Sequence, residues 1–286
     1  MGNTKFGTTE FRWGERTYVM GIINMSPDSF SGDGIGKTDF ALEQARRFVK
    51  EGADILDIGG ESTRPGFTPC TAAEEIKRVV PVIEQLTGEL SIPISIDTSK
   101  SEVALEALKA GAKAVNDVWG LKRAPKIGEL AAKYGVPVFL MSNQREKGGF
   151  DAKINRDTAR YDDVMAEVTA FLKQSVETAL KLGVPRENLI LDPGIGFGKT
   201  WQQDLEIIRR LGELKSLHRP LLVGASRKSF IGKVLDVTAD DRKEGDAAVT
   251  AIAIANGADM VRVHDVKEMV RVCRMSDALV RQSRSA

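Results

Sequence analysis

Two donor-rich side chains, Arg262 and His264, stand two positions apart in the apolar run that starts at Met260. Alternate residues of a β-strand face the same side of the sheet, so both side chains would point the same way. The run Ser226-Arg227-Lys228-Ser229 follows another apolar segment and adds cationic groups. This combination predicts an anion site of the kind that binds phosphate. A buried ion pair or a hydrogen-bonded core histidine is the structural alternative.

A glycine-rich run follows Asp192 and Pro193 and reads Gly194-Ile195-Gly196-Phe197-Gly198-Lys199-Thr200. A P-loop needs a glycine where Pro193 stands, so that motif is excluded. A dinucleotide-binding fingerprint needs a spacing that is one residue longer. We therefore interpret the run as a loop whose glycines let the backbone approach a ligand closely. A sharp turn after Pro193 is the other explanation.

Polar clusters of this kind end eight apolar, strand-like runs. The runs end at Asn24, at Asp57 to Gly66, at Asp97 to Ser99, at Asn116-Asp117, at Met141 to Asn143, at Asp192 to Gly194, at Ser226 to Lys228 and at Arg262 to Asp265. Turn formation and helix capping would explain some of these residues, such as Asp117 and Asp265. In a (β/α)8 barrel all strand ends meet at one rim, where the active site lies.

The elements that would position these residues alternate along the chain. Helical spacing favours nine helices: 40–50, 72–86, 101–110, 124–134, 162–182, 203–214, 229–235, 245–256 and 265–281. A glycine follows several of them before the next apolar run, as a helix C-cap would. The fold class is therefore α/β, a single (β/α)8 TIM barrel, preceded by a lead-in of residues 1–17 that would form a short hairpin at the barrel bottom. A doubly wound sheet would concentrate the ligands at one switch point, which fits less well.

Composition narrows the class of partner. The 286 residues are 42% hydrophobic and 28% charged, with a net charge of +1, so no charged field favours nucleic acid. Membrane spans and signal peptides are not expected, because apolar stretches are short and the N-terminus is polar. Cys70 and Cys273 lack a metal-ligand spacing and favour a reducing, cytoplasmic location. Nothing suggests zinc or iron, whereas Asn24 and the scattered carboxylates suit Mg²⁺.

The chain resembles the dihydropteroate synthase family over roughly residues 18 to 283. The segments that carry the resemblance are Asn24 to Ser31, Asp57 to Gly66, Asp97, Asn116-Asp117, Asp192 to Gly194, Ser226 to Gly232, and Arg262 with His264. The resemblance implies a pterin-binding barrel domain over residues 18–286. It also implies a transferase of folate biosynthesis, which joins 6-hydroxymethyl-7,8-dihydropterin diphosphate to p-aminobenzoate and releases diphosphate with Mg²⁺.

The same resemblance assigns roles to individual residues. The pterin would be held by Asp97, Asn116, Asp192 and Lys228, with Met141 against its ring. The diphosphate and its metal would be bound by Asn24, Arg64, Arg262 and His264, and Asn24 would be the metal ligand. The aminobenzoate pocket would be formed by Phe30, Thr63, Pro65 and Ser229. Arg64, Lys228, Arg262 and His264 would form the catalytic set.

Two departures from the family pattern are visible. Ser31-Gly32-Asp33-Gly34 places its aspartate one position late, and Ser142 stands where the family has histidine after methionine. The first change predicts either a sulfonamide-insensitive form or neutral loop variation. The rival functions are a pterin-dependent methyltransferase and a non-catalytic pterin-binding barrel. Small-molecule substrates and a homodimer are the expected partners, and the late stripe Val270, Val272 and Leu279 could serve either the dimer or the core.

Overall fold

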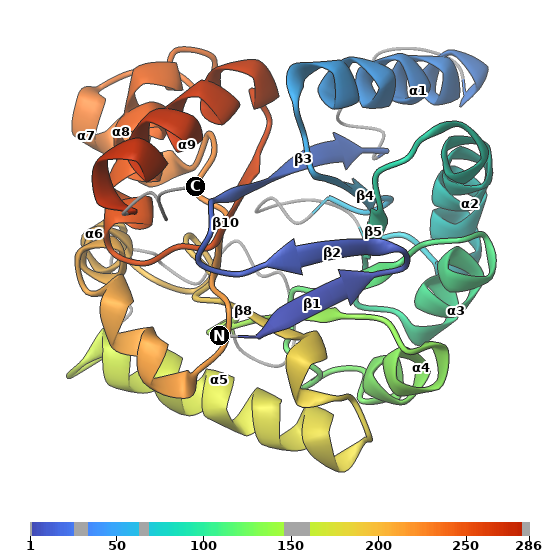
Figure 1. The fold of residues 1–286 in the computed structure, drawn as a ribbon, viewed down its shortest axis with the longest axis horizontal. Helices are drawn as coiled ribbons and strands as arrows, with labels where there is room; N and C mark the ends of the chain where they lie inside the picture. The colour runs from blue at the N-terminus through green and yellow to red at the C-terminus, as the bar shows by residue number, and fades with distance from the viewer. Residues whose placement is uncertain (1, 26–33, 63–68, 146–160, 282–286) are drawn as a thin grey trace.

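The barrel consists of eight parallel strands with helices outside them (Figure 1). The structure is a computed structural model and describes residues 2–25, 34–62, 69–145 and 161–281. In chain order the strands are β3 Tyr18–Asn24, β4 Ile55–Gly59, β5 Ile94–Asp97, β6 Ala114–Asp117, β7 Val138–Met141, β8 Leu189–Asp192, β9 Leu222–Val223 and β10 Met260–Val263. Neighbours pair in the order β8-β7-β6-β5-β4-β3-β10-β9. A parallel bridge between Leu191 and Leu221 joins β8 to the start of β9, so the predicted (β/α)8 class is confirmed.

The helices are close to those predicted from spacing. They are α1 Gly34–Glu51, α2 Ala72–Glu89, α3 Ser101–Lys109, α4 Lys126–Tyr134, α5 Val164–Lys181, α6 Trp201–Arg209, α7 Ser229–Leu235, α8 Lys243–Ala255 and α9 Val266–Val280. The helix expected over 203–214 is wrong in its second half. There α6 ends at Arg209, and the 3₁₀ helix η3 Leu211–Leu217 follows it. Gly212 inside this stretch disfavours a continued α-helix. Another 3₁₀ helix, η2 Arg186–Asn188, lies directly before β8. In the described ranges, no helix is long and apolar enough to cross a membrane.

Helix ends follow local sequence signals. Gly52, Gly111, Gly135, Gly183 and Gly257 all have positive φ angles, between 66° and 110°, as the predicted C-caps require. The N-termini of α2 and α6 carry capping boxes, Thr71 with Glu74 and Thr200 with Gln203. These caps satisfy backbone N–H groups that a helix leaves unpaired.

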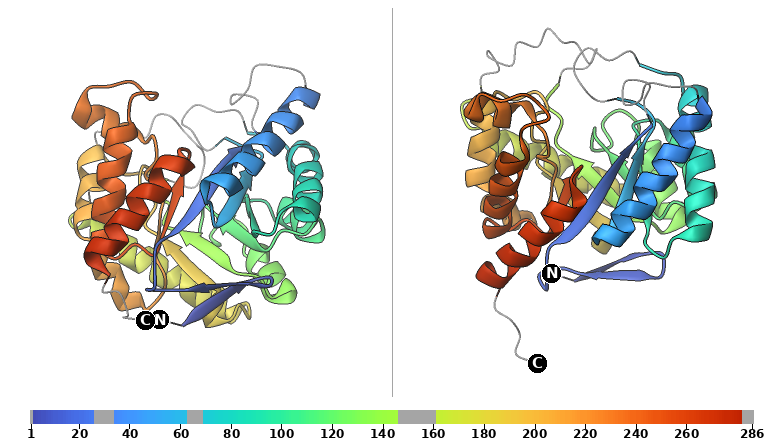
Figure 2. Two further views of the ribbon diagram at one scale, coloured as in Figure 1. Left: turned by 45° about the horizontal axis from the view of Figure 1, so that its top comes forward. Right: turned by 90° about the horizontal axis from the view of Figure 1, so that it is seen from above.

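A hairpin lies across one end of the barrel (Figure 2). Its strands, β1 Asn3–Phe6 and β2 Thr9–Arg12, pair antiparallel, which confirms the hairpin expected in the lead-in. Phe6, Phe11 and Trp13 join Tyr18 and the inward residues of the other strands in one buried cluster. The rings of Phe11 and Tyr18 stack with centroids 4.2 Å apart. This aromatic layer fills the barrel at the N-terminal ends of its strands.

The barrel interior changes from apolar to polar along the strands. Ile55, Ala114, Ile190 and Met260 point inward in the lower layer and belong to the aromatic-capped cluster. Because side chains alternate with a period of two, the residues two positions later also face inward. Those residues are Asp57 on β4, Asn116 on β6, Asp192 on β8 and Arg262 on β10. The fold therefore brings the predicted polar residues together at the C-terminal end of the barrel.

Candidate active site

An ion-pair network forms the centre of the polar layer. The Arg262 guanidinium donates from Nε to Asp57 Oδ2 at 2.6 Å and from Nη2 to Asp97 Oδ2 at 2.7 Å. The Asn116 amide donates to the same Asp57 oxygen at 2.8 Å. Arg262 of β10 thus contacts β4 and β5 directly, and Asp57 links it to Asn116 of β6. The predicted pterin ligands Asp97 and Asn116 do lie together.

The network leaves one buried acceptor unused. Asp57 is fully buried, and its Oδ1 has no hydrogen-bond partner within the described part of the chain. Burial raises the pKa of the Asp97 carboxyl to about 7, with the Arg262 guanidinium opposing the rise and the Asp57 carboxylate adding to it. A carboxyl with this pKa can act as either donor or acceptor near neutral pH.

Asp192 and Lys228 form the second half of the polar layer. Asp192 Oδ1 accepts a 2.7 Å hydrogen bond from the Gly194 N–H, and burial raises the pKa of this carboxyl despite that bond. The Lys228 Nζ lies 4.3 Å from the centroid of the Phe197 ring. Burial lowers the pKa of Lys228 to about 8; the Arg262 charge acts in the same direction and Asp192 opposes it. The site therefore holds carboxylate, amide and ammonium groups, as predicted.

The glycine-rich loop after β8 makes close backbone contacts of its own. A Cβ at Gly194 would lie 2.0 Å from the Ser142 carbonyl oxygen, and one at Gly198 would lie 2.5 Å from the Gln144 backbone. Lys199 is 1% exposed and donates to the carbonyl oxygens of Ser142, Gly194 and Phe197 at 3.2, 2.9 and 3.1 Å. Lys199 therefore holds the loop after β7 against the glycine-rich loop after β8. The glycines of the second loop allow it to approach the backbone of the first loop closely.

Met141 packs in a small buried cluster with Val118, Trp119 and Phe197. The adjacent Ser142 is fully buried. Its N–H donates to the Asp192 carbonyl at 2.9 Å, and its hydroxyl accepts from the Gln144 amide at 3.3 Å. Local hydrogen bonds thus satisfy the serine that replaces the family's histidine at position 142. The neighbouring Met141 cluster is an apolar surface suited to a flat ring.

The residues expected to bind an anion already have partners within the protein. Arg227 forms an ion pair with Asp265 at 2.9 Å, and Arg262 is held by the two carboxylates. The His264 Nδ1 lies 3.1 Å from the Ser226 hydroxyl, which also contacts Asp246. His264 and Arg262 therefore both reach the rim, but each has its own protein partners.

The remaining predicted residues are only partly described. Asn24 ends β3, is half-buried and lies opposite Gly59 in the strand register. Ser229 is exposed at the start of α7. Phe30, Thr63, Arg64 and Pro65 lie outside the described residues, as does Asp33.

Sequence comparison places the chain in a family. A family model described as pterin binding enzyme matches residues 20–264. A dihydropteroate synthase from Clostridium beijerinckii is 46% identical over 280 residues, which cover 97% of this chain and 100% of the relative. The chain belongs to the dihydropteroate synthase family.

Solved dihydropteroate synthase structures share the fold. One from Clostridium difficile, determined in the presence of pteroic acid, has a TM-score of 0.88 and 49% identity, covering 95% of this chain and 100% of that one. Another from Yersinia pestis, in complex with a sulfonamide drug, has a TM-score of 0.88 and 39% identity, covering 97% and 98%. The family and the barrel inferred from the residues are thereby confirmed.

Sequence reasoning gave no role to three residues that the structure places in or next to the candidate site: Asp57, Phe197 and Lys199. Asp57 carried the same signal as Arg262, a charged residue inside an apolar strand. Lys199 had a misleading signal, because the sequence around it looks like a phosphate-binding loop. Phe197 had none, since its position over Lys228 depends on how the glycine-rich loop folds.

A second charged cluster lies beside the site. Lys100 Nζ contacts Glu61 at 2.8 Å and Glu75 at 2.6 Å, and Cys70 is close to both carboxylates. The lysine ammonium already supplies the positive charge that a metal would bring. Asn24, at the end of β3, is not part of this cluster. Its single amide oxygen suits Mg²⁺, which takes few protein ligands and completes its shell with phosphate and water.

Proposed function

We propose that this chain condenses 6-hydroxymethyl-7,8-dihydropterin diphosphate with p-aminobenzoate, giving 7,8-dihydropteroate and diphosphate in folate biosynthesis. As a dihydropteroate synthase it is a transferase. The observation that carries the proposal is the convergence of Asp97, Asn116, Asp192 and Lys228 at one barrel mouth in a chain of this family. In the reaction the pterin methylene carbon loses its oxygen to diphosphate, which leaves with the bonding electrons. The amine nitrogen then bonds to that carbon and releases a proton.

The pterin would bind across the two halves of the polar layer. Asp192 and Lys228 would face one part of its hydrogen-bonding edge, and Asn116 and Asp97 the other. A flat heterocycle with alternating donors and acceptors needs such a set, held in a recessed site. The unpartnered Oδ1 of Asp57 offers one more acceptor for a pterin N–H. Met141 would pack against the ring from the apolar cluster.

The diphosphate would bind nearer the rim, at Asn24, Arg64, Arg262 and His264. Cationic groups and hydrogen-bond donors there would stabilise the negative charge that grows as the carbon–oxygen bond breaks. Asn24 would hold Mg²⁺, which supplies further charge neutralisation on the leaving group. In His264→Ala, diphosphate product inhibition should weaken more than pterin binding. Normal product inhibition in that variant would contradict this placement.

The aminobenzoate pocket would be formed by Phe30, Thr63, Pro65 and Ser229. Of these only Ser229 is described, and its place at the start of α7 follows directly from Lys228 in the pterin site. This adjacency supports a pocket beside the pterin methylene.

Diphosphate release tests the function. The full chain should release diphosphate only when Mg²⁺, the pterin diphosphate and p-aminobenzoate are all present. A methyltransferase would transfer a methyl group from a pterin without releasing diphosphate. A non-catalytic barrel would bind pterin in calorimetry without any turnover. Either of these results would overturn the proposal.

We further propose a homodimer in the cytoplasm, with residues 18–286 as the catalytic domain after the 1–17 lead-in. Val270 is buried in the core, and Val272 packs against it. Leu279 and Met275 of α9 are 73% and 60% exposed, and Ile252 of α8 is 52% exposed. Large exposed apolar side chains on adjacent helices support a subunit contact. Light scattering should give twice the chain mass; a monomer at micromolar concentration would contradict it.

Sulfonamide response concerns the aminobenzoate pocket. The Yersinia pestis relative binds a sulfonamide drug. The one-position shift of Asp33, three residues after Phe30 in the sequence, would let this chain discriminate against such drugs. A difference of about 3 kcal/mol between two binding free energies corresponds to roughly a hundredfold in affinity. The ratio of the sulfonamide inhibition constant to the p-aminobenzoate Michaelis constant measures this. A low ratio would leave the shift as neutral loop variation.

A further inference from the structure

We propose that the barrel carries a second anion site at its N-terminal end, where the Arg186 and Arg219 guanidiniums bind a small oxyanion, a phosphate or a carboxylate. The site lies at the opposite end of the strands from the pterin residues. It is independent of the reaction proposed above.

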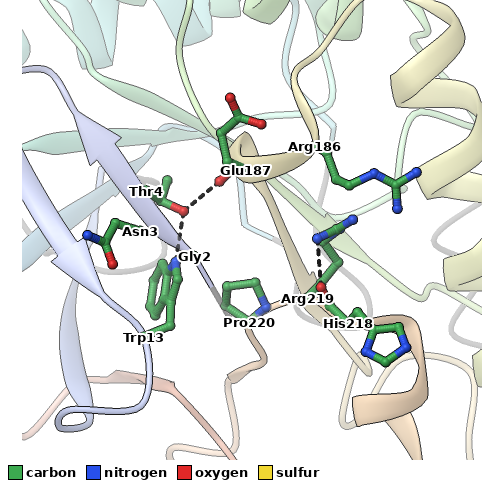
Figure 3. A pocket seen from close by; sticks show the side chains of 9 residues that line it. All are labelled: Gly2, Asn3, Thr4, Trp13, Arg186, Glu187, His218, Arg219 and Pro220. Carbon is green, nitrogen blue, oxygen red and sulfur yellow. Dashed lines mark hydrogen bonds between the residues drawn. The ribbon is translucent and has the colours of Figure 1, made fainter.

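The site is a cavity of about 160 Å³ between the β1–β2 hairpin and the segments that lead into β8 and β9 (Figure 3). Arg186 lies in η2, immediately before β8, and His218, Arg219 and Pro220 immediately precede β9. The hairpin closes the other side with Trp13 and its neighbours. A cavity of this size has room for one oxyanion group.

Arg219 is the buried cation of the site. The residue is only 9% exposed, and its Nε has no hydrogen-bond partner among the residues the structure describes. One bond is present, from Nη1 to the His218 carbonyl at 2.6 Å. Burial lowers the pKa of Arg219, and the neighbouring Arg186 charge lowers it further. A buried guanidinium with an unused donor is destabilising unless something supplies an acceptor.

No carboxylate in the described part of the chain fills that role. Arg186 is exposed and forms no ion pair with any described residue. Glu187 also lines the cavity, but its carboxylate is turned away from the Arg219 guanidinium (Figure 3). Its charge raises the pKa of Arg219 less than burial and Arg186 lower it.

Two other polar side chains of the cavity, Trp13 and Thr4, are bonded within its wall. The Trp13 indole donates to the Thr4 hydroxyl at 2.8 Å, and that hydroxyl donates to the Glu187 carbonyl at 2.5 Å. These bonds hold the hairpin against η2, so the walls are fixed. The unused donor capacity of the Arg219 and Arg186 guanidiniums suits phosphate and carboxylate oxygens, which such groups bind in charge-assisted hydrogen bonds.

The chain supplies its own reporters for a test, because it has only two histidines. His218 lines this cavity, and His264 lies at the pterin end. Imidazole NMR signals of the full chain would be followed while sodium phosphate, and separately sodium acetate, is added. Sodium chloride at matched ionic strength controls for screening. A His218→Gln variant assigns the signals.

We expect the His218 signals to shift saturably with phosphate, acetate or both, and the anion that acts identifies the class. Arg219→Gln should weaken this binding at least tenfold, and Arg186→Gln several-fold, while the His264 response and turnover stay unchanged. Arg186 is exposed, so its variant keeps the test open if Arg219→Gln does not fold. Arg274→Gln, an exposed change of the same charge on α9, should have no effect. A His218 shift that chloride reproduces, that persists in both pocket variants, or that is absent with both anions overturns the proposal.

Discussion

Replacing Arg262 with methionine would remove the cation at the centre of the active site. Its guanidinium pairs with Asp57 at 2.6 Å and with Asp97 at 2.7 Å, and the side chains of these aspartates are 0% and 12% exposed. The variant would leave two buried carboxylates 40 residues apart in sequence but adjacent in space. Breaking a buried ion pair from one side is destabilising by about 3–5 kcal/mol. We expect a loss of that size at pH 8.5.

The loss should depend on pH in a defined direction. The folded-state pKa of Asp97, about 7, is above its value in an unfolded chain, so this group makes stability fall as pH rises from about 4 to 7. Without Arg262 the pKa would be higher, and the fall would continue to higher pH. The difference between variant and wild type should therefore be smaller at pH 5.5 than at pH 8.5.

Urea unfolding followed by circular dichroism at both pH values measures this difference. Arg46→Met breaks an exposed ion pair with Glu89 and should change stability little at either pH. Adding Asp97→Asn to Arg262→Met should recover part of the loss, since one uncompensated charge is gone. A loss below about 1 kcal/mol that is the same at both pH values would refute the reasoning, because it is the size expected of an exposed pair.

Three further predictions concern single residues. Asp192→Ala should abolish pterin binding in calorimetry, because the pterin donors would lose a buried acceptor; unchanged affinity would show that the pocket is misplaced. Pterin affinity should fall above about pH 8, where Lys228 loses its charge, and Lys228→Arg should remove this alkaline limb; an identical limb in the variant would assign it to another group. Lys199→Met should lower stability by about 1–3 kcal/mol, since three buried carbonyls lose their donor. The exposed control Lys181→Met should not.

Local patterns were enough to predict the barrel and the rim. The order of strands and helices could be derived because its signals involve residues close together in the sequence. These signals are helical spacing, glycine C-caps and polar clusters at strand ends. The period of two also correctly placed Arg262 inside the barrel. The boundary at Arg209 was missed because apolar residues at i and i+3 lie on one face of both a 3₁₀ helix and an α-helix, so a short pattern does not separate them.

Partners that lie far apart in the chain could not be predicted in the same way. Arg262 is separated from Asp57 by 205 residues and from Asp97 by 165. An isolated charged residue in a strand predicts that a partner exists, and the closed barrel decides which one. Lys199 shows the same limit, since its three carbonyl partners depend on how two loops pack together.

Product formation tests the central claim most directly. With Mg²⁺ and both substrates, wild-type protein should yield 7,8-dihydropteroate and diphosphate in equal amounts, quantified by mass spectrometry and by a phosphate assay after pyrophosphatase treatment. Asp192→Ala should yield neither above background, while the exposed control Lys181→Met should match wild type. Diphosphate without dihydropteroate, or equal yields from Asp192→Ala, would contradict the account.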